Sequence, residues 1–84
     1  MGKAHDTWVE RIAAGIERYL SINPAAADSV VGIAQWWLPT VGLDGAPEDV
    51  EEALFLLRSR GVVEEVRVGN RQCFWRRLTT RKGE

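Results

Sequence analysis

The stretch PEDVEEALFLLRSR, residues 47–60, decides the fold, because it has the pattern of one amphipathic helix. Pro47 suits the first turn of a helix, where its missing N–H leaves no bond unmade, and Gly61 suits the position after the last turn. The apolar residues recur at i, i+3, i+4 and i+7 and therefore share one face. They are Val50, Ala53, Leu54 and Leu57. The pattern predicts a helix with this face in the core and an acidic outer face.

Two more helices are predicted upstream of this stretch. Residues 7–21 carry apolar side chains at helical spacing, and Thr7 with Glu10 has the spacing of a capping box. Residues 29–38 repeat the helical period, with Ser29 as a suitable N-cap. We expect the most buried side chains to lie where the three predicted helices meet. They are Ile16, Ile33, Trp37, Leu54 and Leu57.

The remaining segments are predicted to be strands or connections. Residues 62–68 and 71–78 are extended runs, which predict two antiparallel strands. Residues 24–28, PAAAD, and 39–46, PTVGLDGA, predict connections without regular structure between the helices.

The turn between the two strands decides which aromatic residue faces inward. Residues 69–70, Gly-Asn, suit a two-residue turn with glycine first. That turn would place Val66 opposite Cys73, with Trp75 on their face and Phe74 on the other. A three-residue turn would exchange the two aromatic residues, so the sequence leaves open whether Phe74 or Trp75 points inward.

Composition restricts the class of protein. A chain of 84 residues fits one domain, over residues 1–84, with an ordered part at about residues 7–78. The formal net charge of −1 gives no overall attraction to nucleic acid or anionic lipid. Cys73 is the only cysteine, so no internal disulfide is expected. No apolar run reaches transmembrane length and no signal peptide opens the chain, so we expect a cytoplasmic protein without a membrane partner.

The sequence does not favour an enzyme. It contains no Ser/His/Asp set, no cluster with metal-ligand spacing and no glycine-rich phosphate loop. Glu51 and Glu52 are adjacent, so they point in different directions from a helix and cannot act as a paired acid and base. We therefore expect no catalytic residue, no cofactor, no metal and no small-molecule substrate.

Three stretches resemble the winged helix-turn-helix family, and the resemblance covers residues 7–78. Residues 29–34, SVVGIA, resemble the capped entry into the family's second helix. The apolar face of residues 47–57, followed by RGVV at 60–63, resembles the end of its recognition helix and the entry into its wing. Residues 74–76, FWR, resemble the aromatic end of the last wing strand. The resemblance implies an α+β fold, a small winged helix of three helices and a C-terminal antiparallel hairpin, which serves DNA binding, protein docking or dimerisation.

The outer face of the predicted third helix favours a protein partner, or self-association, over DNA. In DNA-binding members of the family this helix enters the major groove. Here its exposed positions carry carboxylates, which repel phosphates, and one aromatic residue ringed by charge, as interface anchors are. The candidate protein interface comprises Glu48, Glu51, Glu52, Phe55 and, as a second candidate, Trp36. The alternative is that the acids only solvate the helix and that another segment covers Phe55.

Trp36 also has two readings. Gly32, one turn before it, leaves a shallow slot in the helix surface that a partner could fill. The alternative is that the loop at residues 39–46 folds over the indole ring.

A DNA-binding regulator that uses its basic hairpin is the alternative function. Residues 61–84 carry six basic and three acidic side chains. Arginines interleaved with aromatic residues can bind phosphate and stack on bases, although here Glu64 and Glu65 partly balance them. The possible nucleic-acid contacts are Arg67, Arg71, Arg76 and Arg77.

Overall fold

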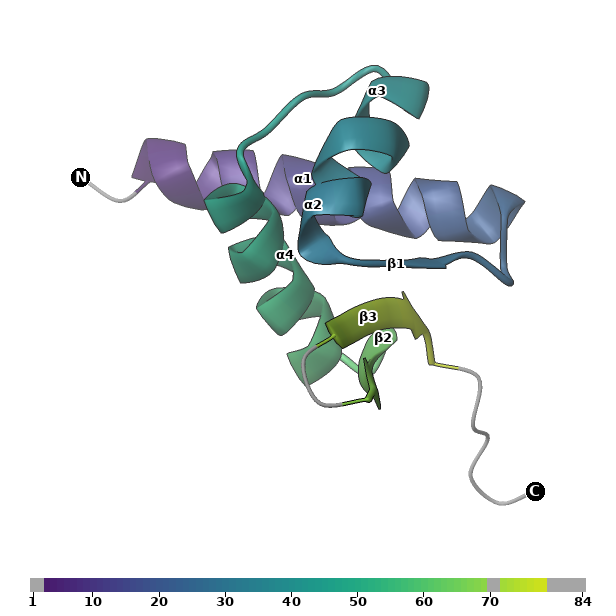
Figure 1. Ribbon diagram of the computed structural model, residues 1–84. Helices are drawn as coiled ribbons and strands as arrows, with labels where there is room; N and C mark the ends of the chain where they lie inside the picture. Colours follow the sequence, from purple (N-terminus) through teal and green to yellow (C-terminus); the bar gives the residue numbers. More distant parts are fainter. Residues whose placement is uncertain (1–2, 70–71, 79–84) are drawn as a thin grey trace.

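The computed structural model describes residues 3–69 and 72–78 and shows an α+β protein, as the sequence predicted. Its helices pack on one side of a three-stranded antiparallel sheet (Figure 1). In chain order the elements are α1 (Lys3–Ile22), β1 (Ala27–Asp28), α2 (Val30–Gly32), the π-helical stretch η1 (Ile33–Trp37), α3 (Leu38–Thr40), α4 (Pro47–Ser59), β2 (Val63–Val68) and β3 (Gln72–Arg77).

The first helix begins earlier than predicted. α1 starts at Lys3, so Thr7 lies inside the helix, and the expected capping box with Glu10 is wrong. Its apolar face was predicted correctly, because Ile12 and Ile16 are fully buried. α1 extends across the whole molecule, and α4 packs against the N-terminal half of α1 (Figure 1).

The elements α2, η1 and α3 form one continuous helical segment over residues 30–40, where the sequence predicted residues 29–38. Ser29 caps it as predicted, because its Oγ accepts a hydrogen bond of 3.1 Å from the N–H of Gly32. Pro39 does not end the segment. It lies in the first turn of α3, after the hydrogen-bond pattern has changed, and a first turn tolerates proline.

The π-helical stretch decides which residues of this segment reach the core. The N–H of Leu38 donates to the C=O of Ile33, an i→i+5 bond. This pairing brings Leu38 onto the buried side of the helix beside Trp37, and both are in the core. Trp36 is left on the outside, with 66% of its surface exposed.

The sheet has one strand more than predicted, in the order β1-β3-β2. Residues 24–28 were expected to be an irregular connection, which is wrong at its end, because Ala27 and Asp28 pair with Arg76 and Trp75 of β3. A strand of two residues is too short to show alternation in a sequence. Its pairing partner, rather than its own composition, makes it extended.

The register of β2 and β3 corresponds to the three-residue alternative. Val66 pairs with Phe74, and Val68 with Gln72, so the predicted pairing of Val66 with Cys73 is wrong. Burial explains the choice, because Val63 and Trp75 are each only 2% exposed and share a face only in this register. Trp75 therefore faces inward on the face of β2 that carries Val63, whereas Val66 and Phe74 share the opposite face. The predicted turn residue Asn70 lies outside the described residues.

The core lies where the three helical segments and the inner face of the sheet meet. The predicted central side chains are confirmed as core residues, with Ile16, Ile33, Leu54 and Leu57 fully buried and Trp37 only 3% exposed. The ring of Tyr19 stacks on that of Trp37 with centroids 4.5 Å apart.

The loop before α4 completes the packing around the core. Val41 and Leu43 pack so closely over Gly15 that a Cβ there would lie 2.6 Å from Leu43 Cδ1. The loop at residues 41–46 therefore covers α1. Among the residues that the structure describes, no helix is both long and apolar enough to cross a membrane.

Candidate protein-docking surface on α4

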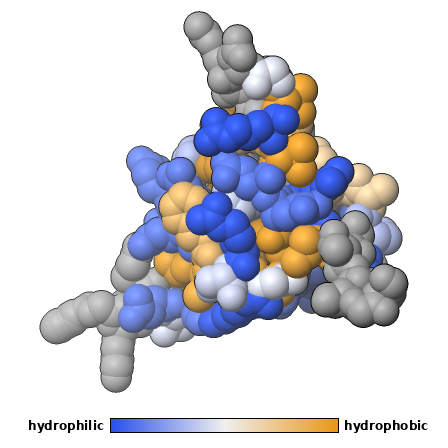
Figure 2. Space-filling model, turned by 90° about the horizontal axis from the view of Figure 1, so that it is seen from below, coloured by the Kyte–Doolittle hydropathy of each residue, from blue (hydrophilic) through white to orange (hydrophobic). Residues whose placement is uncertain are grey.

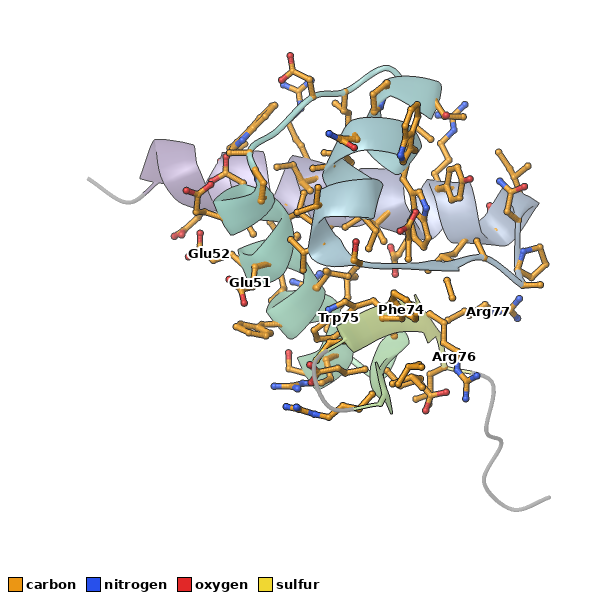
Figure 3. All side chains as sticks on the ribbon, in the orientation of Figure 1. Glu51, Glu52, Phe74, Trp75, Arg76 and Arg77 are labelled. Carbon is orange, nitrogen blue, oxygen red and sulfur yellow. The ribbon has the colours of Figure 1, made fainter. Side chains whose placement is uncertain are left out.

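The outer face of α4 is exposed, as the sequence predicted. The opposite face holds the helix in the core through Val50, Ala53, Leu54 and Leu57. The exposed side chains of Glu48, Glu51, Glu52 and Phe55 are called the α4 outer face below. Figure 3 shows Glu51 and Glu52 on the side of α4 that points away from the helical segment of residues 30–40.

Phe55 is exposed and is also held in position. Its side chain is 45% exposed, and its ring lies at a tilt of 57° beside that of Trp75, with centroids 6.0 Å apart. The Arg58 guanidinium lies over both rings, 5.2 Å from the centroid of Phe55 and 5.7 Å from that of Trp75. It also forms an ion pair of 3.4 Å with Glu65 of β2. These contacts restrict the rotamers of Phe55, so that little side-chain entropy is left to lose on binding.

The sequence did not indicate these ring contacts. Phe55 and Trp75 are far apart in the chain, and their approach depends on the register of β3, which the sequence left open. A signal was present in the three-residue spacing of Phe55 and Arg58, which places them as neighbours on a helix surface.

A groove between α1 and α4 adjoins the outer face. It has a volume of about 410 Å³ and is lined by Asp6, Val9, Glu10, Glu52 and Leu56. This α1–α4 groove was missed by the sequence reasoning, because it depends on how the two helices cross. Glu52 belongs both to the groove and to the α4 outer face.

One ion pair lies at the groove. The guanidinium of Arg60 donates to both carboxylate oxygens of Glu10, at 3.3 and 2.7 Å. These hydrogen bonds lower the pKa of Glu10 below its ordinary value. The groove therefore keeps this negative charge at neutral pH and already shows the geometry in which it holds a guanidinium.

Trp36 is exposed, but the slot proposed beside it does not exist. A Cβ on Gly32 would overlap the Asp28 carboxylate, which fills the space that the glycine leaves. Asp28 Oδ1 also accepts a hydrogen bond of 2.8 Å from the N–H of Ser29. The alternative that residues 39–46 cover the tryptophan is wrong as well. The side chain of Trp36 is 66% exposed, so residues 39–46 do not cover its indole ring.

The candidate basic contacts are spread over β2 and β3. Arg67 and Arg77 are exposed, and Arg76 forms an ion pair of 2.7 Å with Glu64. Arg71 lies outside the described residues. In Figure 3, Arg76 and Arg77 lie at the end of β3 farther from Glu51 and Glu52.

The side of the molecule below the sheet is mixed in character. Figure 2 shows separate apolar patches there between hydrophilic side chains, rather than one continuous apolar area. Val68, 48% exposed, is one of the apolar residues of β2. Monomeric proteins commonly expose single apolar side chains in this way, so these patches do not indicate a binding surface on this side.

Cys73 has no features of a reactive thiol. It is partly buried, and its hydrogen bond with the Glu65 carboxylate raises the pKa of the thiol, with burial adding to the effect. Because the thiolate is the reactive form, the raised pKa makes Cys73 less nucleophilic at neutral pH. Within residues 3–69 and 72–78, no group of three or more His, Cys, Asp or Glu side chains could hold a metal ion.

No family model, curated protein or solved structure matches this chain. The resemblance to winged-helix proteins, and every function that follows from it, therefore stays a prediction that rests on the residues themselves.

Proposed function

We propose that this chain is a winged-helix domain without catalytic activity that docks another protein through the α4 outer face. Phe55 is the anchor, and Glu48, Glu51 and Glu52 form a charged rim around it. In this proposal β2 and β3 are the wing and α4 takes the place of the recognition helix. A cytoplasmic location belongs to the same proposal, supported by the single cysteine.

One observation carries the proposal: an aromatic side chain that is 45% exposed is fixed in place by Trp75 and Arg58 and is bordered by carboxylates. Binding hot spots favour a preformed aromatic anchor within a rim that excludes water. The acidic rim also supports a protein partner over nucleic acid, because it would repel a phosphate backbone.

The variant Phe55→Ala tests this proposal. We expect it to weaken association with the partner, or of the chain with itself, by about 2 kcal/mol or more, as loss of an anchor does. We expect its unfolding free energy to fall by only about 0.5–1.5 kcal/mol, the value of its ring contacts. Quantitative capture from cell extract, sedimentation velocity and thermal melting would be measured on the same preparations.

Ile22→Ala is the matched control, because it truncates another exposed apolar side chain, 66% exposed, at the end of α1. Proteins captured by the wild type and by Ile22→Ala, but not by Phe55→Ala, would support the proposal. If Phe55→Ala unfolds the domain, Phe55 is a core residue. If it changes no association at all, the α4 outer face is only a solvated surface.

DNA binding through the proposed wing is the second candidate, favoured by the exposure of Arg67 and Arg77. We expect no sequence-specific complex, because Arg76 is already paired with Glu64 and the carboxylates of α4 face outward. Weak binding should fall steeply between about 50 and about 150 mM salt in a fluorescence anisotropy titration. A submicromolar complex with one duplex that survives about 150 mM salt and competitor DNA would make DNA binding the better reading.

A further inference from the structure

The α1–α4 groove has the features of a binding site for one kind of protein segment. Its floor is apolar, because Val9 is only 8% exposed and Leu56 is partly buried against the core. Its rim is acidic on both sides, with Asp6 and Glu10 from α1 and Glu52 from α4. A floor and rim of this kind match a segment that presents an apolar side chain between basic ones.

The rim already binds the group that such a segment would bring. Arg60, at the C-terminal end of α4, holds Glu10 through two guanidinium nitrogens, the closer at 2.7 Å. This pair is exposed, with about half of each side chain in contact with solvent, so an incoming arginine can add to it or exchange with it. Because exposed ion pairs contribute little stability, exchange does not threaten the fold.

Charge complementarity extends past the groove. The neighbouring outer face of α4 adds Glu48 and Glu51. Among the described side chains, five carboxylates therefore border this continuous surface, against two arginines, Arg60 at the groove and Arg58 over Phe55. An anionic partner such as nucleic acid or a lipid headgroup would be repelled, and an uncharged apolar helix would partly desolvate the carboxylates without bringing a cation to them.

We propose that the α1–α4 groove binds a basic segment of another protein, with an apolar side chain on Val9 and Leu56 and flanking Lys or Arg side chains on Asp6, Glu10 and Glu52. This inference rests on the proposed function, since it names the chemistry of the partner and adds the groove to the surface around Phe55.

A fluorescent peptide of the sequence Lys-Arg-Leu-Lys-Arg-Leu-Lys-Arg is the probe for the test. We expect it to bind the wild type, and to bind about threefold more weakly to Glu52→Gln and about tenfold more weakly to the double variant Asp6→Asn/Glu52→Gln, as the loss of one and two ion pairs implies. Raising the salt concentration should weaken binding of the peptide to the wild type, because salt screens exposed ion pairs. Replacing both leucines of the peptide by glycine should also weaken it, because the apolar floor would lose its contact.

Glu17→Gln is the matched control, because it removes the same charge from an exposed position of α1 that lies outside the groove. It should bind the peptide almost as the wild type does, and equal melting temperatures would show that all variants are folded. Amide chemical shifts in a ¹H–¹⁵N titration should move at Val9 and Leu56.

The inference is wrong if the peptide does not bind up to about 1 mM, or if Glu52→Gln and Glu17→Gln bind alike. It is equally wrong if a Glu-containing peptide of the same pattern binds as well. Self-association that depends on Glu52 and does not respond to the peptide would make a second copy the occupant. Peptide binding that fails while Phe55→Ala still loses its protein partner refutes the groove alone and leaves the proposed function standing.

Discussion

Trp75→Ala is expected to lower the free energy of unfolding by about 3–5 kcal/mol, the usual range for removing a buried tryptophan. Trp75 is 2% exposed and closes the core from the sheet side, next to Val63. Its loss leaves a cavity and also removes the ring contacts that hold Phe55 and Arg58. The expected change is a large share of the stability of a domain this small.

Urea unfolding of Trp75→Ala and of Phe74→Ala measures this effect with a control. Phe74 is the adjacent aromatic residue, lies on the opposite face of β3 opposite Val66, and is only partly buried. Its truncation should cost less than half as much, because less of its surface is removed from water on folding. If Phe74→Ala is the more damaging variant, Phe74 rather than Trp75 faces the core, and the face of β3 described above is wrong.

Leu54→Ala is expected to lower the free energy of unfolding by about 2–5 kcal/mol. Leu54 is fully buried on the inner face of α4, where this helix meets α1 and the segment of residues 30–40. The variant removes the transfer free energy of the side chain and leaves a cavity that the packed helices around it cannot fill completely.

Leu56→Ala, two residues further along α4, is the control for Leu54→Ala. It makes the same change in the same helix, so helix propensity is matched, but Leu56 is only partly buried at the floor of the α1–α4 groove. Leu56→Ala should lower the free energy of unfolding by clearly less than Leu54→Ala does. A loss below about 1 kcal/mol for Leu54→Ala would show that α4 is turned about its axis relative to this description.

The helices could be predicted from the sequence because their signals are local. The 3.6-residue period of α4, proline at its start and glycine after its end gave its position to within a residue. Ser29 acts as a cap through a hydrogen bond only three residues along the chain. The exposure of Phe55 followed from the same periodicity, because the core face of α4 was defined.

The third strand and the register of the sheet could not be predicted, because they depend on contacts between segments that are distant in the sequence. Ala27 and Asp28 form a strand only because β3 lies beside them. The register that turns Trp75 inward depends on where Val63 meets the core. The π-helical bond between Leu38 and Ile33, beside which Leu38 enters the core, has no spacing signal in the sequence.

The carboxylate of Asp28 fills the space that the missing side chain of Gly32 leaves, so the residues at positions 28 and 32 depend on each other. Asp28 occupies the volume that any Cβ on residue 32 would need, and it bonds the Ser29 N–H from there. Alanine at position 32 therefore requires either that the Asp28 carboxylate moves away and gives up its bond with the Ser29 N–H, or that position 28 changes as well. The two positions should vary together among relatives. Viewed alone, Asp28 looks like an ordinary turn residue and Gly32 like an ordinary helix glycine.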